Sequence, residues 1–375
     1  MTAISALDST TASFVLSRPH RTVFATGGER SFRRVPDALA ALRDGSATHI
    51  VGALPFDPAA PAALWAPEAI RFQDGPLCPA IATLPEFELA EAVPEPDRHR
   101  ERVRTAVEQM SAPGARLRKV VLARALRLRA AEPVVAADIL DRLVSGDPGR
   151  NGFLVDLTDG GRTGNLLVGS TPEVLVRREG RRVSSYPLAG SMRRTTDPYR
   201  DREIGAALLN SSKNLAEHRY VVDHVRAALA AGTADVRAPL TPELTHTPAL
   251  WHLGTPITAT ARPGVGALEL AAALHPTPAI CGTPAAAAAR MIAELEGDRG
   301  FYAGAVGWCD AEGNGEWMVS IRCAELDSDG LGLTAFAGGG ILAESDPDDE
   351  FAETTTKFET MLGALGLTGE AVVFR

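Results

Sequence analysis

The chain has 375 residues, and its 38 Lys and Arg against 47 Asp and Glu give a formal net charge of −9. Hydrophobic residues make up 45% and charged residues 23%, which excludes a disordered or collagen-like chain. The acidic balance argues against nucleic-acid binding, and no apolar run reaches the roughly 18 residues that span a bilayer. We therefore expect a small-molecule ligand, with no nucleic-acid or membrane partner.

Two features favour a cytoplasmic protein. The first twenty residues lack a basic segment followed by an apolar core, so no signal peptide is predicted. The cysteines are scattered, without the spacing of a zinc site, and are expected to be reduced thiols. They are Cys78, Cys281, Cys309 and Cys323.

The predicted elements come as groups of strands separated by helices. Strands are expected at 22–26, 49–54, 119–129, 153–157, 165–178, 255–262, 301–310, 316–325 and 331–336. Helices are expected at 97–111, 133–145, 198–231 with a break near 210–212, 283–296 and 346–365. The pattern indicates an α+β fold. We expect residues 1–92 to add strands to a main fold formed by residues 93–375, and 338–340 to form a turn.

Lysine is rare in this chain. Only Lys119, Lys213 and Lys357 are lysines, so the other 35 basic residues (38 − 3) are arginines. A lysine retained in such a chain is expected where a compact, titratable ammonium is needed, and chance retention is the alternative.

The last predicted helix places chemistry on one face. Glu350, Glu353 and Lys357 are spaced i, i+3 and i+7 and project from the same side. Two carboxylates suit a hard cation such as Mg²⁺, and the lysine suits an anionic group beside it. The simpler alternative is a solvated face with an ordinary Glu–Lys pair.

Two other carboxylates are candidates. Glu217 lies on a helix face that is expected to pack inward, where a carboxylate is costly unless it is paired or bound to metal. Glu173 follows a strand interrupted by Pro172, and shielding from water would raise its pKa toward that of a general acid. A loop glutamate that caps a neighbour is the commoner case.

Gly338–Gly340 lack side chains, so their N–H groups are able to approach an anion, and Arg322 is a candidate carboxylate clamp. A tight turn would explain these glycines equally well. His252 and His275 stand among apolar residues and are expected to be core histidines. Residues 330–335 match GxGxxA, but no helix follows, so dinucleotide binding is rejected.

Ten short segments follow one another in the order found in one enzyme family. They are KVVLAR (119–124), GSTPE (169–173), PLAGS (187–191), KNLAEH (213–218), WHLGTP (251–256), LHPTPAICGTP (274–284), DRGFY (298–302), SIRCAE (320–325), GGG (338–340) and SDP (345–347) leading to Lys357. Together they resemble the chorismate-utilising enzymes over residues 95–370, and within that family the isochorismate synthases.

The resemblance implies a fold and a reaction. The fold would be a large α+β domain with two antiparallel sheets flanked by helices and the site between them. Chorismate would become isochorismate as water adds at C2 and the C4 hydroxyl leaves. Lys119 would be the general base, and Glu173 would be the general acid.

The resemblance also implies ligand contacts. Mg²⁺ would be bound by Glu217, Glu350 and Glu353. The substrate would be held by Arg322, Lys357, Gly338, Gly339 and Gly340, with His275, Gly254 and Thr255 beside it.

The sequence departs from the family at two places. Ser212 and Asn214 stand where the family usually has carboxylates, which favours a catalytically silent, chorismate-binding relative as one alternative. Gly254 stands where isochorismate synthases commonly have alanine and salicylate synthases often have glycine. Its small size is expected to leave room in the pocket, so salicylate synthase, which also eliminates pyruvate, is another alternative.

An enzyme that uses ammonia is disfavoured because relatives of that kind typically have glutamine at the position of Lys119. A monomer is expected. An enzyme that consumes isochorismate is its expected partner.

Overall fold

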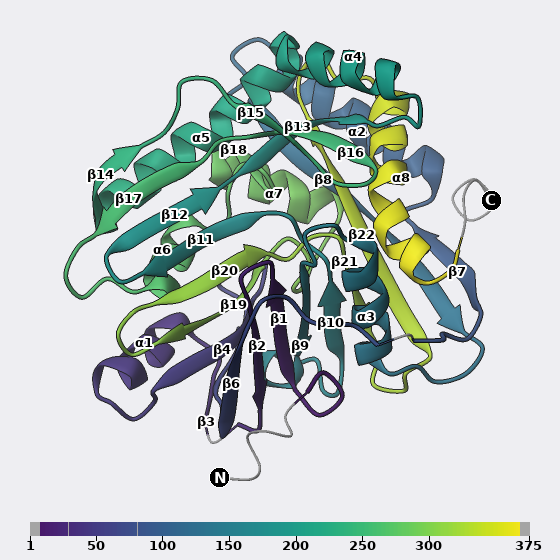
Figure 1. The fold of residues 1–375 in the computed structure, drawn as a ribbon. Coiled ribbons are helices and arrows are strands. Elements are labelled where there is room, and N and C mark those ends of the chain that lie inside the picture. The colour runs from purple at the N-terminus through teal and green to yellow at the C-terminus, as the bar shows by residue number, and fades with distance from the viewer. Residues whose placement is uncertain (1–7, 29, 81, 368–375) are drawn as a thin grey trace.

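The computed structural model describes residues 8–28, 30–80 and 82–367. Within these ranges, two large antiparallel sheets and one small one pack with eight helices (Figure 1). The predicted α+β fold with two antiparallel sheets flanked by helices is confirmed, and the small sheet is an addition. None of the described helices is long and apolar enough to cross a membrane.

The ten-stranded sheet contains the longest strand pair. Its spatial order is β18 (Gly282–Thr283), β8 (Lys119–Ala130), β22 (Gly332–Ile341), β21 (Cys323–Leu326), β10 (Leu166–Gly169), β9 (Gly152–Asp156), β1 (Phe14–Arg18), β2 (Arg21–Thr26) and β6 (Ala69–Asp74). β7 (Phe87–Val93) also pairs with β8.

The nine-stranded sheet faces this one. Its order is β14 (Thr233–Arg237), β17 (Ile257–Ala261), β12 (Arg182–Tyr186), β11 (Val174–Glu179), β20 (Gly315–Val319), β19 (Ala305–Asp310), β4 (His49–Leu54), β5 (Ala63–Ala66) and β3 (Arg30–Phe32). The three-stranded sheet is β13 (Leu188–Arg193), β16 (Leu250–Gly254) and β15 (Glu243–His246).

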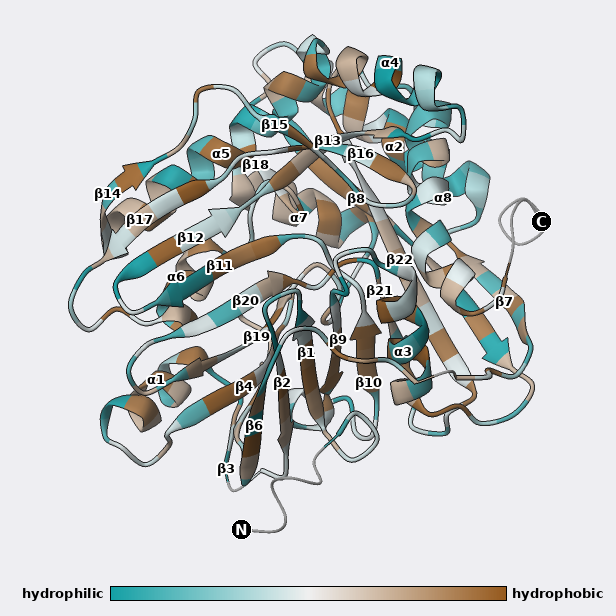
Figure 2. Cartoon of the chain, in the orientation of Figure 1, coloured by the Kyte–Doolittle hydropathy of each residue, from teal (hydrophilic) through white to brown (hydrophobic). Residues whose placement is uncertain are grey.

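The helices cover these sheets. They are α1 (Val35–Arg43), α2 (Pro96–Ser111), α3 (Ala136–Gly146), α4 (Pro198–Leu209), α5 (Ser212–Gly232), α6 (Ala267–Leu274), α7 (Ala285–Leu295) and α8 (Pro347–Ala364). Helices α3 and α8 pack on the ten-stranded sheet over one hydrophobic cluster, and a larger cluster includes residues of both large sheets. Figure 2 shows the hydrophobic residues concentrated along strands such as β1, β9 and β10.

Strands from residues 14–93 belong to both large sheets. β1, β2, β6 and β7 lie in the ten-stranded sheet, whereas β3, β4 and β5 lie in the nine-stranded sheet. β7 spans the predicted boundary at 92/93 and pairs with β8 on its far side. The boundary itself stays a prediction.

Three predicted elements differ from the structure. The predicted strand 165–178 is two strands, β10 and β11, in different sheets. Gly338–Gly340 are not a turn but the end of β22, because β8 continues to pair with them through Ala123–Val121. The predicted strand 316–325 is two strands, β20 and β21, in different sheets. Arg322, directly before β21, has φ +51°, a left-handed conformation that redirects the chain between the two strands.

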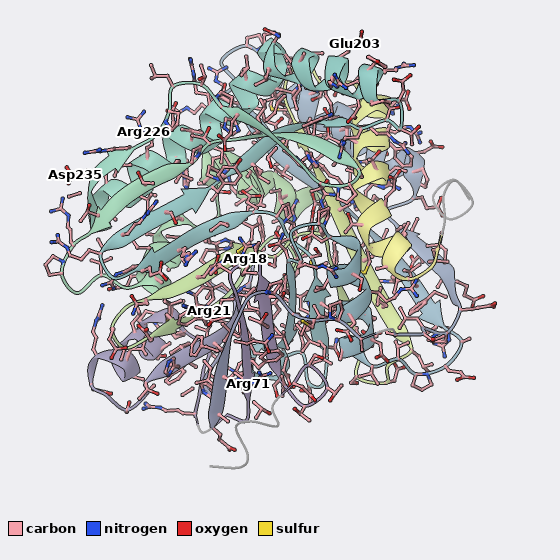
Figure 3. The ribbon with its side chains drawn as sticks, in the orientation of Figure 1. Arg18, Arg21, Arg71, Glu203, Arg226 and Asp235 are labelled. Carbon is pink, nitrogen blue, oxygen red and sulfur yellow. The ribbon has the colours of Figure 1, made fainter. Side chains whose placement is uncertain are left out.

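A buried ion pair joins the two large sheets. Arg18, labelled in Figure 3 at the end of β1, donates from Nε to Glu316 Oε1 on β20 at 3.0 Å. Burial alone would raise the pKa of Glu316, but the bond from His20 and the charge of Arg18 hold it down to about 2. The carboxylate is therefore charged in the folded state at any pH well above 2.

We predict that this pair supports stability against acid. Because the folded pKa of Glu316 lies below its unfolded value of 4.5, its contribution is complete above pH 4.5 and is lost as the pH falls toward 2. Glu316→Gln should remove about 3 kcal/mol of pH-dependent stability over that window. Urea unfolding between pH 2 and 7 measures it. Glu101→Gln, in the exposed pair with Arg98, is the control, and an equal change in both variants would contradict the prediction.

Candidate active site

The ladder between β8 and β22 brings the first residues of one strand beside the glycines of the other. Val121 pairs with Gly340, and Ala123 pairs with Gly338. Lys119, at the start of β8, is fully buried at this end of the ladder. The ladder therefore sets a buried ammonium next to a stretch of strand that has no side chains.

The glycines make room for carboxylates. A Cβ at Gly340 would lie 2.2 Å from Glu217 Oε1 and 3.0 Å from Lys119 Cε, and a Cβ at Gly339 would lie 3.3 Å from Glu350 Oε2. Neither glycine has a positive φ. The close approach of these side chains, not the backbone conformation, is what calls for glycine here.

All three lysines of the chain bind the three predicted metal-binding glutamates. Lys119 Nζ lies 2.9 Å from Glu217 Oε1 as an ion pair. Lys213 Nζ donates to Glu350 Oε1 at 2.8 Å. Lys357 Nζ donates to Glu353 and, at 2.9 Å, to the carbonyl oxygen of Gly338. The rare lysines are therefore placed beside carboxylates that are buried or partly buried and need a counter-charge.

The two glutamates of α8 have different electrostatic surroundings. Burial and the nearby Glu353 carboxylate raise the pKa of Glu350 to about 7. Burial also acts on Glu353, but the Lys357 ammonium beside it holds its pKa below the usual range. Oε1 of Glu350 also accepts a bond from Ser345 Oγ at 2.7 Å, whereas Oε2 has no partner within the described residues.

A cavity of about 80 Å³ lies between strands β8 and β22 of the ten-stranded sheet, strands β13 and β16 of the small sheet, and helices α5 and α8. Its polar lining includes Glu173, Glu217, Glu353, Arg322, Lys357, His252, Ser191 and Tyr302, together with Gly338 and Gly340. We call it the catalytic cavity. It brings together predicted residues from segments more than 170 positions apart in the sequence.

Glu173 has the properties predicted for an acid. It is 3% exposed, and burial raises its pKa to about 7, although a bond from the Leu188 N–H and the charges of Lys119, Lys357 and Arg322 oppose the shift. At neutral pH a substantial fraction of this carboxyl therefore carries a proton. It can donate that proton inside a site that excludes water.

Two cations and one histidine share the catalytic cavity. Arg322 is 6% exposed, and its Nη1 has no hydrogen-bond partner within the described residues. Burial lowers the pKa of Arg322 to about 10, so it remains charged at neutral pH. Burial and the charges of Arg322 and Lys357 keep the pKa of His252 well below its usual value, so that ring is neutral. The cavity suits a ligand with carboxylate groups.

One of the two histidines lines the catalytic cavity, and it is not the one that the family resemblance places beside the substrate. His275 does not line the catalytic cavity, and its Nε2 lies 2.9 Å and 3.0 Å from the carbonyl oxygens of Pro55 and Phe56. His252 was expected to be a core histidine, yet it lines the cavity, with Nε2 unpartnered among the described residues. Both are surrounded by apolar sequence, so no local signal separates them.

Five other predicted site residues lie outside the lining, and Gly254 is one of them. Lys119 and Gly339 lie next to the carboxylates rather than on the cavity wall, and Thr255 is bonded to His218 Nε2 at 2.7 Å. Glu350 lies behind Gly339. These residues support the lining or contact the residues that form it.

The expectation that Gly254 leaves room in the pocket is wrong. A Cβ at position 254 would lie 2.6 Å from the Tyr186 hydroxyl and 3.1 Å from Leu188 Cδ2. Tyr186 donates from that hydroxyl to Glu243 Oε1 at 2.9 Å, which fixes it there. The space that a larger residue would take belongs to Tyr186, so Gly254 gives no reason to expect a different product.

Sequence reasoning missed Tyr302 and Ser191 as cavity residues. Tyr302 stacks on Phe336, with ring centroids 5.0 Å apart, and Ser191 Oγ donates to Glu353 Oε1 at 3.2 Å. Both lie in segments that carry the family resemblance, which was the available signal. Asn214, where a carboxylate is usual, bonds to Ser211 Oγ at 2.8 Å at the start of α5.

The donors around Gly339 and Gly340 fit a hard divalent cation in their chemistry. Glu217, Glu350 and Glu353 supply carboxylate oxygens, and Glu350 Oε2 is buried without a partner in the described chain. As these side chains stand, no three His, Cys, Asp or Glu residues in ranges 8–28, 30–80 and 82–367 form a cluster that could hold a metal. A cation would have to take up oxygens that the lysines now bind.

Comparison with known proteins agrees with this geometry. The family model described as chorismate binding enzyme matches residues 79–366. The chain belongs to the chorismate-binding enzyme family. A protein named MenF from Mycobacterium tuberculosis is 50% identical over 94% of this chain and 96% of its own length. The isochorismate synthase DhbC of Bacillus subtilis is 38% identical over 94% of both chains.

A solved structure has the same fold as this chain. The crystal structure of DhbC from Bacillus anthracis superposes with a TM-score of 0.89 and 36% identity, covering 97% of this chain and 99% of the other. The likeness therefore extends beyond the family segments and includes the strands of residues 14–93.

We predict that Gly340→Ala destabilises the site. The new methyl group would overlap Glu217 Oε1, and moving that carboxylate breaks its pair with Lys119. The free energy of unfolding should fall by about 1–3 kcal/mol, measured by urea unfolding. Gly146→Ala is the control, because a Cβ at that helix position meets no atom within 4 Å. Equal stability of Gly340→Ala and the wild type would rule out the proposed crowding.

Proposed function

We propose that this protein is an isochorismate synthase, an isomerase that converts chorismate to isochorismate. The observation that carries the proposal is the buried Glu173, which lines one cavity together with Arg322 and Lys357 and whose pKa of about 7 makes it a proton donor. The likeness to the isochorismate synthase DhbC over almost the whole chain supports the same reaction. The four free cysteines agree with a cytoplasmic location.

Chorismate carries two carboxylates, and the catalytic cavity offers two cations. Arg322 presents an Nη1 that has no partner among the described residues, and Lys357 donates to the carbonyl oxygen of Gly338 on β22. We propose that these groups bind the carboxylates and fix the ring against Glu173. Neutral His252 lies in the same wall and can accept or donate one hydrogen bond without adding charge.

Proton transfer would use one residue on each side of the ring. Glu173 gives its proton to the hydroxyl that leaves C4, so water departs rather than hydroxide. Lys119 takes a proton from the water that adds at C2, which requires that its pair with Glu217 opens and that the amine is neutral. One water enters and one leaves, so substrate and product are isomers.

We propose Mg²⁺ as the cofactor, bound by Glu217, Glu350 and Glu353. When bound, it would neutralise a substrate carboxylate next to these glutamates. The chain contributes the carboxylates, their spacing along α5 and α8, and glycines that keep the approach to them open. Lys213 is a charge partner of Glu350 and not a catalyst.

Product analysis tests the function. Purified protein incubated with chorismate and Mg²⁺ should form a product of unchanged mass and different retention by liquid chromatography with mass detection, and EDTA should abolish it. Salicylate with pyruvate would indicate a lyase, and an amino product in the presence of ammonium would overturn the role of Lys119. Chorismate binding by calorimetry without any product would indicate a silent binding protein.

We predict that Glu173 controls the alkaline side of the pH profile. Because its carboxyl must be protonated to act, kcat should fall as the pH rises above about 7. Glu173→Gln keeps the size of the side chain and an acceptor for the Leu188 N–H but has no acidic proton, so kcat should fall about 10²–10⁴-fold. Thermal unfolding checks that the variant is folded. Near-normal turnover by the variant would refute the assignment.

A further inference from the structure

A second, larger cavity lies directly outside the catalytic cavity. Its volume is about 380 Å³. It lies between the ends of α3 and α8, the turn between β15 and β16, and the segment that precedes Glu173. Pro172 and Arg322 line both cavities, so they form the wall between them. We call this second cavity the outer chamber.

The two cavities differ in what they are able to hold. Cavities that bind small organic ligands have volumes of about 300–1,000 Å³. The catalytic cavity, at about 80 Å³, is too small for a substituted ring in this conformation, whereas the outer chamber is large enough. A substrate therefore has room outside the wall before it has room inside it.

The acidic groups of the outer chamber are already bonded. Asp147 Oδ2 accepts bonds from the backbone N–H and the side-chain amide of Asn151, both at 2.7 Å. Glu359 Oε1 accepts a bond from Arg193 at 2.8 Å. The Arg193 guanidinium offsets the charge of Glu359, whereas the neutral donors of Asn151 leave the Asp147 carboxylate charged. One carboxylate without a cationic partner among the described residues therefore shares the lining with two guanidinium groups.

The basic groups are not cancelled in the same way. Arg142 donates from Nε to the carbonyl oxygen of Ala364 at 3.0 Å, and none of its bonds within the described chain goes to a carboxylate. Arg322 at the inner wall has a buried Nη1 without a partner in the described residues. Leu143, Pro172 and Pro248 add apolar surface between the two guanidinium groups.

We propose that the outer chamber is a second binding site for the dicarboxylate substrate, occupied before it passes Pro172 and Arg322 into the catalytic cavity. The inference rests on the proposed function, which identifies that substrate as chorismate. Arg142 attracts one carboxylate from solvent, the apolar wall receives the ring, and Arg322 is reached from either side. Binding then has two steps, and the first one sets the association rate.

Filling the outer chamber with a side chain tests the proposal. Gly363 on α8 and Gly146 on α3 line the chamber, and a Cβ at either position meets no atom within 4 Å. Gly363→Phe and Gly146→Phe should therefore occupy the chamber without disturbing the fold. Gly363→Ala and Gly146→Ala are matched controls, since each adds one methyl group and favours the helix. The substitutions are made on two different helices, so that a folding defect in one variant does not decide the result.

The association rate of chorismate, followed by stopped-flow tryptophan fluorescence, is the first measurement, and kcat/KM and kcat are the second. Both Phe variants should lose about tenfold or more in association rate and kcat/KM, while kcat stays within about threefold. Association rates within about twofold of wild type in the folded Phe variants would overturn the proposal.

The proposed function can fail separately. A wild-type protein that binds chorismate but forms no isochorismate would refute the function, and the association rates would still decide the role of the chamber. A wild-type protein that does not bind chorismate would refute both.

Discussion

The active site depends on holding several carboxylates close together in a region that is largely shielded from water. A buried carboxylate without a partner costs several kcal/mol, so each one needs a cation or a proton. The chain meets this need with its three lysines, which pair with Glu217, Glu350 and Glu353. These pairs fit only because the strand residues Gly338–Gly340 have no side chains. The pairing of β22 with β8 holds this part of the strand in place.

The same region gives neighbouring carboxyl groups different protonation. Glu173 has no ion-pair partner within the described ranges, and burial raises its pKa to about 7. Glu353 is only partly buried, and Lys357 holds its pKa low. One group is thus able to give a proton while the other remains an anion, although they share a cavity. The surroundings of two ordinary glutamates are therefore enough to give them different protonation states.

Sequence reasoning located the charged groups better than their surroundings. Helical spacing placed Glu350, Glu353 and Lys357 on one face, and the rarity of lysine marked all three counter-charges. Sequence reasoning failed at glycines whose role is set by a side chain that is distant in the sequence. Gly339 and Gly340 looked like a turn because the carboxylates that need their space come from other helices. Gly254 was expected to leave open space, but Tyr186, 68 residues earlier in the sequence, fills that space.

The position of the acid is coupled to the position of the clamp. The N–H of Ser170 donates to the carbonyl oxygen of Arg322 at 3.1 Å, so the segment that carries Glu173 and the left-handed residue that carries the guanidinium are held together. Pro172, which lies between Ser170 and Glu173 in the sequence, limits how this segment bends. A movement that widened the catalytic cavity at this wall would therefore shift Glu173 and Arg322 together. The hydrogen bond between Ser170 and Arg322 would therefore keep the carboxylate clamp and the proton donor in the same relative position while the substrate enters.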